Sequence, residues 1–318
     1  MVAFLIRRVF GMILVLLAVS FIVYVIFIKI PGGDPAVRIA GRTATQANIA
    51  SIRHKLGLDQ SFIVQWFDLM KQLFTAKLVS YSDQTNVVRQ IEEGLPATFS
   101  LCIGAGIIWL GFGVLVGTIS AVTAGRLSDR AITGLALIGI SLPVAWLGLL
   151  LRYFFAGEGG AVSWFPDGGY VPLTQNPAQW LYSLILPWLT LAVLFIGFYG
   201  RVLRSNILDT INEDFVRTAK AKGLSARRVL IKHVLRASLI PIVTLFGLDF
   251  ASVLGGGAII TESVYQLHGV GFYAFQAIGN IDLPPLMGVT LYGAMFIVVF
   301  STLVDVAYAY LDPRIRLS

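Results

Sequence analysis

Six long apolar stretches dominate the pattern of hydrophobic and polar positions along the chain. They cover residues 9–30, 97–122, 131–151, 181–199, 239–260 and 286–310. A bilayer hydrocarbon core about 30 Å thick requires roughly 20 consecutive helical residues, and each stretch is close to or above that length. The pattern therefore predicts an all-α membrane protein in which six transmembrane helices form a single domain over residues 1–318.

The composition agrees with a membrane protein. The chain of 318 residues is 57% apolar and 13% charged, whereas soluble domains carry about 25% charged residues. These values exclude a soluble globular enzyme. Arg7 and Arg8 are similar to the start of a twin-arginine export signal, but the apolar stretch after them is longer than a signal core of about 7 to 15 residues. A spanning helix is therefore favoured.

The distribution of basic residues predicts the orientation in the membrane. An even number of spans places both termini on one side, and 15 of the 24 lysine and arginine residues fall on that side. Because basic residues accumulate in short cytoplasmic loops, we expect the N and C termini to be cytoplasmic. The segment 31–95 is then extracytoplasmic. It exceeds the length of about 60 residues above which charge has little influence on translocation.

Two outer segments have patterns of their own. Within residues 31–95, the apolar spacing predicts short amphipathic helices at 48–56 and 62–74. We expect them to lie against the outer surface of the membrane domain. The segment 157–177 is rich in glycine and proline, which predicts turns.

The segment 201–236 is the long cytoplasmic loop of this arrangement, and it is patterned. We expect Asn212 to cap a short helix with Glu213 and Asp214 in its first turn, where the helix dipole favours acidic side chains. Gly223 ends that helix, because glycine accepts the left-handed conformation. Ser225 then opens a second helix whose apolar positions recur at spacings of three and four.

Phe215 and Ala219 lie one turn apart on the first of these helices. A phenylalanine on a short charged helix suits docking onto a soluble partner, since its burial contributes about 1.5–3 kcal/mol. The alternative is that Phe215 packs back on the membrane domain. The pattern alone favours neither interpretation.

The run Asp-Phe-Val-Arg-Thr-Ala-Lys-Ala-Lys-Gly-Leu-Ser at 214–225 resembles the EAA loop of ABC-importer permeases. More narrowly, it is similar to the dipeptide, oligopeptide and nickel importer family, in its peptide permease "B" type. Arg217 and Thr218 depart from the general Glu-Ala-Ala pattern, whereas Ala219 and Gly223 match it. Further family-like segments lie at 31–35, 56–59, 95–98, 141–148, 261–271 and 311–316.

The resemblance implies a type I ABC importer permease fold. In such importers two permease subunits form a gate, and a cytoplasmic coupling helix of each docks on an ATPase. Here the coupling (EAA) loop is 201–236. The ATPase-coupling residues that the resemblance implies are Glu213, Asp214, Phe215, Val216, Arg217, Thr218, Ala219, Lys220, Ala221, Gly223 and Leu224.

The implied partners are a second, related permease subunit in a heterodimer, two ABC ATPase subunits, an extracytoplasmic solute-binding protein and membrane lipid. ATP and Mg are expected on the ATPase subunits, because this chain has no glycine-rich phosphate loop. We expect no cofactor, no metal site and no catalytic residue in the chain itself. Nucleic acid is not expected, since the basic residues are spread among apolar spans. The expected location is a bacterial-type inner membrane.

Three acidic and polar residues are candidates outside the loop. Asp249 is the deepest acidic residue, and a carboxylate at mid-bilayer costs about 2.5–3.5 kcal/mol unless it faces water or a partner. It lines the translocation path, with Ser252 beside it, or it forms an interhelical hydrogen bond. Glu262 is expected on the outer surface, in contact with the binding protein. The run 255–257, three glycines, predicts either a helix interruption or close helix packing.

The leading functional hypothesis is therefore the membrane subunit of an ATP-driven importer of short peptides. Nickel or other small solutes remain alternatives within the family. A self-sufficient secondary transporter or channel is a second class, for which paired ionisable groups or duplicated halves would be expected at the midplane. A purely structural membrane scaffold is a third class, and it leaves the loop pattern without a purpose.

Overall fold

The computed structural model describes the chain except residues 1, 30–34, 41–44, 56, 158–161 and 312–318. The family-like segments at 31–35, 56–59 and 311–316 lie wholly or partly outside the described residues. The described elements are α1 (Val2–Lys29), α2 (Pro35–Ala40), α3 (Gln46–Lys55), α4 (Phe62–Phe74), α5 (Val87–Val122), α6 (Leu127–Ser141), α7 (Val144–Phe155), α8 (Pro177–Thr210), α9 (Asp214–Ala221), α10 (Ala226–Val229), η1 (Leu230–Leu235), α11 (Arg236–Ser252), η2 (Val253–Gly257), α12 (Ile259–Tyr265), α13 (Val270–Asn280) and α14 (Leu283–Leu311).

The predicted spans are present as long helices. Five are long and apolar enough to cross a membrane, and the pair α6 and α7 makes up to six. The first and last agree closely with the predicted ranges, since α1 and α14 cover 2–29 and 283–311. Helices at the two places predicted in the outer segment are confirmed as α3 and α4, but only α4 is amphipathic.

The third predicted span, 131–151, is present as a bent pair of helices. α6 and α7 meet at an angle of 101°. Pro143 explains the break, because it has no N–H to donate and it restricts the residue before it to extended backbone. Leu142 has φ −77° and ψ 124°, outside the helical region.

Two helices extend beyond the predicted spans. α5 begins at Val87, ten residues before the predicted start, and α8 continues to Thr210, past the predicted end at 199. Both extensions hold polar residues that a hydrophobicity window excludes. The loop between α8 and the fifth span is therefore shorter than the predicted loop 201–236.

The fifth span begins in that loop and ends at a glycine. The helical path runs from Ala226 to Gly257 as one span, so the second helix of the loop continues directly into the membrane. Gly256 has φ +146°, a conformation that residues with a Cβ rarely adopt. The predicted helix interruption at 255–257 is confirmed, and α12 continues in a new direction.

α5 and α8 pack along each other as the centre of the domain. A Cβ placed on Gly117 of α5 would lie 2.7 Å from the Gly200 carbonyl oxygen of α8, so small residues allow the backbones to approach. Trp109 is fully buried here and stacks on Phe195 at a centroid distance of 4.5 Å. A second buried cluster joins α1, α4, α5 and α14 through residues such as Tyr24, Met70 and Met287.

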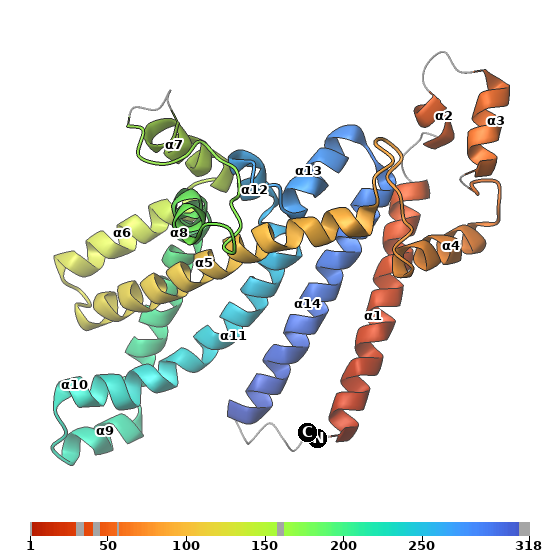
Figure 1. Ribbon diagram of the computed structural model, residues 1–318. Helices are drawn as coiled ribbons and strands as arrows, with labels where there is room; N and C mark the ends of the chain where they lie inside the picture. Colours follow the sequence, from red (N-terminus) through yellow and green to blue (C-terminus); the bar gives the residue numbers. More distant parts are fainter. Residues whose placement is uncertain (1, 30–34, 41–44, 56, 158–161, 312–318) are drawn as a thin grey trace.

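The elements divide between two ends of the bundle (Figure 1). α9 and α10 lie at the lower end, where α1 begins and α14 ends. At the other end lie α7, α12 and α13, together with α2 and α3 on one flank, and α4 lies below α2 and α3 beside α1. The loop predicted to face the cytoplasm is thus separated by the length of the bundle from the segments predicted to be outside.

Candidate functional site

The short helix α9 is the centre of the candidate site. Its inner side is formed by Val216 and Ala219, which are 0% and 5% exposed and belong to the same buried cluster as Leu203 and Ile207 of α8. Phe215 is 46% exposed. The structure therefore places the phenylalanine on the outer side of a helix that its neighbours fix to the bundle.

Charged and polar side chains surround Phe215. The exposed residues around it are Glu213, Asp214, Arg217, Thr218, Lys220, Ala221 and Lys222. Arg217 approaches Asp214 at 3.5 Å, one turn away. An exposed aromatic ring within a mixed-charge surface is typical of a contact made with a soluble protein.

The two ends of α9 differ from the prediction in one respect. Glu213, not Asn212, is the residue before the helix, and the Asn212 amide donates to the Leu208 carbonyl oxygen instead. Because α8 runs on to Thr210, Asn212 lies in the turn that follows α8 and not at the start of α9. The predicted stop at Gly223 is confirmed by its φ of +77°, after which Leu224 is half-buried.

The loop that carries α9 is fixed where it leaves and where it rejoins the bundle. The Ser238 hydroxyl lies 3.2 Å from the Asn206 carbonyl oxygen and 3.1 Å from the Thr210 hydroxyl. Ser238 is on α11 and both partners are on α8. The apolar stripe of the second helix is also confirmed, since Val229 and Val234 are buried. The two ends of the loop are therefore held to each other by hydrogen bonds.

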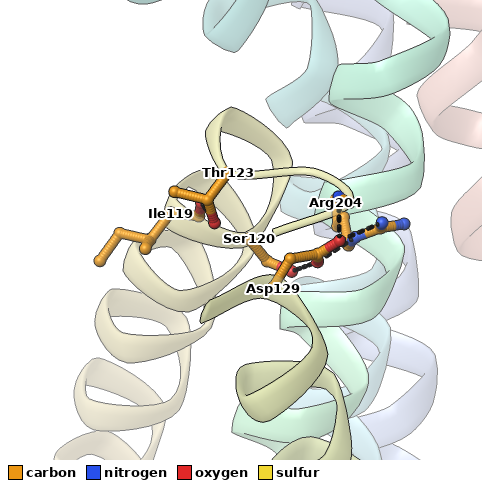
Figure 2. Close-up of polar contacts among 6 residues, drawn as sticks. Ile119, Ser120, Thr123, Asp129 and Arg204 are labelled. Atoms are coloured by element: carbon orange, nitrogen blue, oxygen red, sulfur yellow. Dashed lines mark hydrogen bonds and ion pairs between the residues drawn. The ribbon is translucent and has the colours of Figure 1, made fainter. Parts of the chain in front are cut away.

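A buried ion pair connects the same part of α8 to the α5–α6 hairpin. The Arg204 guanidinium donates to both carboxylate oxygens of Asp129 at 2.8 Å (Figure 2). Asp129 is 4% exposed and also accepts from the Ser120 hydroxyl at 2.5 Å and the Gly125 amide at 2.9 Å. Each carboxylate oxygen is thus paired, as a buried charge requires. The cluster links three helices near the α9 end.

The two candidate path residues, Asp249 and Ser252, differ in their surroundings. The Tyr199 hydroxyl of α8 donates to the Asp249 carboxylate of α11 at 2.7 Å. This contact is the interhelical hydrogen bond given as an alternative for Asp249. Ser252, three residues later, is exposed on the surface of the subunit.

The prediction of Glu262 as an outer-surface contact is wrong. Its side chain is 0% exposed, and its carboxylate accepts from the Thr98 hydroxyl at 2.7 Å and the Phe272 amide at 2.9 Å. Burial raises the pKa of the Glu262 carboxyl to about 7, although these hydrogen bonds act in the opposite direction. The turn at Gly256 redirects α12 so that Glu262 points between α5 and α13.

A second polar cluster lies at the end of the bundle opposite α9. Arg152 of α7 donates to both carboxylate oxygens of Asp167, at 2.9 and 2.7 Å, and to the Val264 carbonyl oxygen at 2.7 Å. The hydrogen bond from Arg152 lowers the pKa of Asp167. Tyr265 adds a 2.8 Å contact with the Thr190 hydroxyl. These contacts fix the turn-rich outer loop to α7 and α12. Within the described residues, no group of three or more His, Cys, Asp or Glu could hold a metal ion.

Comparison with known proteins identifies the family of the chain. Residues 113–317 match the binding-protein-dependent transport system inner membrane component, and residues 1–102 match the N-terminal part of such membrane components. The chain belongs to this family of transport-system permeases. It is therefore a multi-pass inner-membrane protein and a permease subunit of an ABC importer, as the resemblance of its loop implied.

Relatives cover the permease from end to end. A protein of Brucella abortus named as a peptide transport system permease is 37% identical over 317 residues, 99% of both chains. The dipeptide transport system permease protein DppB of Alkalihalophilus pseudofirmus is 33% identical over 337 residues, 99% of this chain and all of that one. A crystal structure of an amino acid ABC transporter with histidines shares the fold, with a TM-score of 0.50 over 70% of this chain and 94% of that chain at 16% identity.

Several structural residues of the permease were not predicted from its sequence. Asp129, Arg204 and Arg152 were counted only as charges, although each pairs inside the domain. The one local signal was Asp129 in the first turn of a helix, a position that the helix dipole favours by itself. Their partners lie 15 to 75 residues away, beyond any local spacing.

Proposed function

We propose that the permease forms half of a translocation path for short peptides and is driven by ATPase subunits that dock on α9. Peptide transport is the function named for the Brucella abortus and Alkalihalophilus pseudofirmus relatives. ATP and Mg bind to the ATPase subunits, and an extracytoplasmic binding protein delivers the peptide. A related permease subunit supplies the other half of the path.

The exposure of Phe215 carries the proposal for coupling. Val216 and Ala219 attach α9 to the bundle, so the outward ring is available to a cleft on another protein. Glu213 and Asp214 before the ring and Lys220 and Lys222 after it give the surface a mixed-charge rim. Rim charges set the orientation of a docked partner.

Movement of α9 reaches the membrane through contacts that do not depend on the partner. Ser238 connects the start of α11 to α8, and Asp129 connects α8 to the α5–α6 hairpin. When the ATPase dimer closes, both coupling helices move with it, and the bundle passes between its two packed states. Ser252 on the exposed side of α11 lines the path, and Asp249 positions that helix through Tyr199.

The experiment is to reconstitute the assembled importer in vesicles and to measure uptake of a labelled dipeptide with ATP inside. Phe215→Ala is the variant, and Leu127→Ala is the matched control, because Leu127 is an exposed apolar side chain at the same end. We expect Phe215→Ala to reduce both uptake and dipeptide-stimulated ATP hydrolysis at least about tenfold, as removal of a central interface aromatic does. The unfolding temperature should stay the same.

Two results would contradict the proposal. Equal uptake by Phe215→Ala and Leu127→Ala would remove α9 from the coupling step. Uptake in vesicles without ATP would favour the secondary-transporter class instead. Competition by unlabelled dipeptide but not by nickel complexes is expected for a peptide path.

A further inference from the structure

A polar pocket lies between α4, the turn that joins α3 to α4, and the segment 78–81 that leads to α5. Its volume is about 290 Å³, at the lower limit of the range of about 300–1,000 Å³ that small-molecule sites occupy. The residues of α4 that line it are Gln65, Asp68, Leu69 and Gln72. They recur at spacings of three and four, so they share one face of the helix. We call it the α4 pocket.

The walls of the α4 pocket are held together by one side-chain amide. The Gln65 oxygen accepts from the Tyr24 hydroxyl of α1 at 2.8 Å. The Gln65 nitrogen donates to the carbonyl oxygens of Leu58 and Gln60, at 3.2 and 2.8 Å. Gln65 thus attaches α4 to α1 and to the turn before α4. Because these bonds form within the chain, the pocket is preorganised, and a ligand does not have to order it.

One wall of the pocket carries an unpaired backbone edge. Val79 lies opposite Asn86 in an antiparallel bridge. The hydrogen bonds of this bridge join the residues on either side of the pair, so the N–H and C=O groups of Val79 itself point away from Asn86. Neither group has a hydrogen-bond partner among the described residues.

The contact made by Lys77 shows which way these two groups point. The Lys77 amide donates to the Gln72 carbonyl oxygen of α4 at 2.8 Å. Exposure alternates from Lys77 to Val79, with Leu78 buried between them, as in extended backbone. In such backbone the amides of residues two apart point to the same side. The N–H and C=O groups of Val79 therefore point toward α4, and Val79 and Gln72 line the same pocket.

The α4 side of the pocket carries a carboxylate. Asp68 is exposed to the pocket and forms no hydrogen bond or ion pair with another described residue. A backbone donor and acceptor on one wall match the main chain of an extended peptide, as in strand addition to a sheet edge. An unpaired carboxylate on the other wall matches an ammonium group. A short peptide with a free N-terminus has both features.

We propose that the α4 pocket binds a short extended peptide, with its main chain paired to Val79 and its N-terminal ammonium on Asp68. A dipeptide carries both groups in a molecule small enough for the volume. The pocket belongs to the segment 31–95, which is predicted to be extracytoplasmic, so it holds a peptide before that peptide enters the path. This assignment depends on the proposed function, because it takes the ligand to be the peptide that the importer carries.

The test measures equilibrium binding of labelled dialanine to the assembled membrane complex, purified in mild detergent without its binding protein. Asp68→Asn removes the charge at nearly constant size. Glu92→Gln is the matched control, since it removes the charge of an exposed carboxylate on α5 that does not line the pocket. We expect binding to weaken about fivefold or more for Asp68→Asn, as the loss of a charged hydrogen bond does, and to stay unchanged for Glu92→Gln. Unlabelled dialanine should compete, and N-acetyl-dialanine should compete about fivefold less well.

Val79→Pro tests the backbone contact, because proline has no N–H to donate. Val79→Ala is its control, since alanine keeps the N–H and shortens the side chain. We expect several-fold weaker binding for Val79→Pro only. The unfolding temperature should stay the same in both variants, because the Val79 N–H has no partner among the described residues that the substitution could remove.

Three results would overturn the α4 pocket as a peptide site. They are equal binding by Asp68→Asn and Glu92→Gln, equal competition by the acetylated dipeptide, and a crosslink from Gln72→Cys to the binding protein in the assembled importer. Dipeptide uptake by the wild-type importer in vesicles is measured in parallel. Uptake without binding at the pocket would contradict this site alone, whereas the absence of both would also contradict the proposed function.

Discussion

The Ser80 hydroxyl donates a 2.6 Å hydrogen bond to the Asp282 carboxylate across 202 positions of the chain. The same carboxylate accepts from the backbone amides of Tyr81 and Ser82 at 3.1 Å each. Asp282 is 4% exposed and lies between α13 and α14. The segment before α5 is thus attached to the turn that precedes α14.

Removing this carboxylate should loosen the outer segment. Asp282→Ala leaves the Ser80 hydroxyl and two amides without an acceptor, and each buried donor left unpaired costs about 1–3 kcal/mol. We expect faster hydrogen exchange over residues 78–86, measured by mass spectrometry in detergent. Glu92→Ala is the control, because Glu92 is an exposed carboxylate on α5 outside the measured segment. Hydrogen exchange over residues 78–86 that is as slow in Asp282→Ala as in the wild type would contradict the prediction.

The ion pair at the α9 end should behave as one unit. Asp129→Ala leaves Arg204 without the carboxylate that binds both of its donor groups, so the unfolding temperature should fall by several degrees. Arg204→Ala should lower it as much, and the double variant should add little, because neighbouring residues of one network are not additive. Asp209→Ala, an exposed carboxylate on the same helix, should leave the unfolding temperature unchanged. Additive decreases in the unfolding temperature would show that Asp129 and Arg204 contribute independently of each other.

The buried carboxyl of Glu262 should make stability depend on pH. Its pKa is raised from an ordinary value of 4.5 to about 7, so the folded chain holds the proton more tightly than the unfolded chain. This contribution is complete below about pH 4.5 and is lost as the pH rises through 7, to a limit of about 3 kcal/mol.

Glu262→Gln should therefore remove part of the pH dependence. The variant should unfold at a higher temperature than the wild type near pH 8 and differ less from it near pH 5, since glutamine carries no charge and its one carbonyl oxygen keeps one of the two hydrogen bonds. Thermal unfolding in detergent measures both. Glu93→Gln is the control, because Glu93 is exposed on α5. A parallel shift at both pH values would be evidence against the assignment.

The contact between Gly293 of α14 and Gly255 of η2 should be intolerant of any side chain. A Cβ on Gly293 would overlap the Gly255 carbonyl oxygen, and such overpacking costs about 1–3 kcal/mol. Gly293→Ala should lower the unfolding temperature and reduce transport. Gly111→Ala is the control, since a Cβ there meets nothing within 4 Å. Normal stability of Gly293→Ala would mean that the two helices separate without cost.

Much of the site followed from local pattern. α9, its acidic start and its end at Gly223 were predicted because capping and helix-dipole preferences act within a few residues. The spacing could not decide which side Phe215 faces. That depends on Val216 and Ala219 packing into the cluster formed with α8, which only the assembled helices provide.

The sequence by itself determined the apolar spans, the two short helices within 31–95, the helices on either side of Gly223 and the family. Hydrophobic length, helix periodicity and motif are properties of contiguous residues. The tertiary structure decided the 101° bend between α6 and α7, the burial of Glu262 and the pairing of Asp129 with Arg204. These features depend on groups that lie 75 or 164 positions apart or on the angle at one proline. Helix packing brings such groups together, and no local period records it.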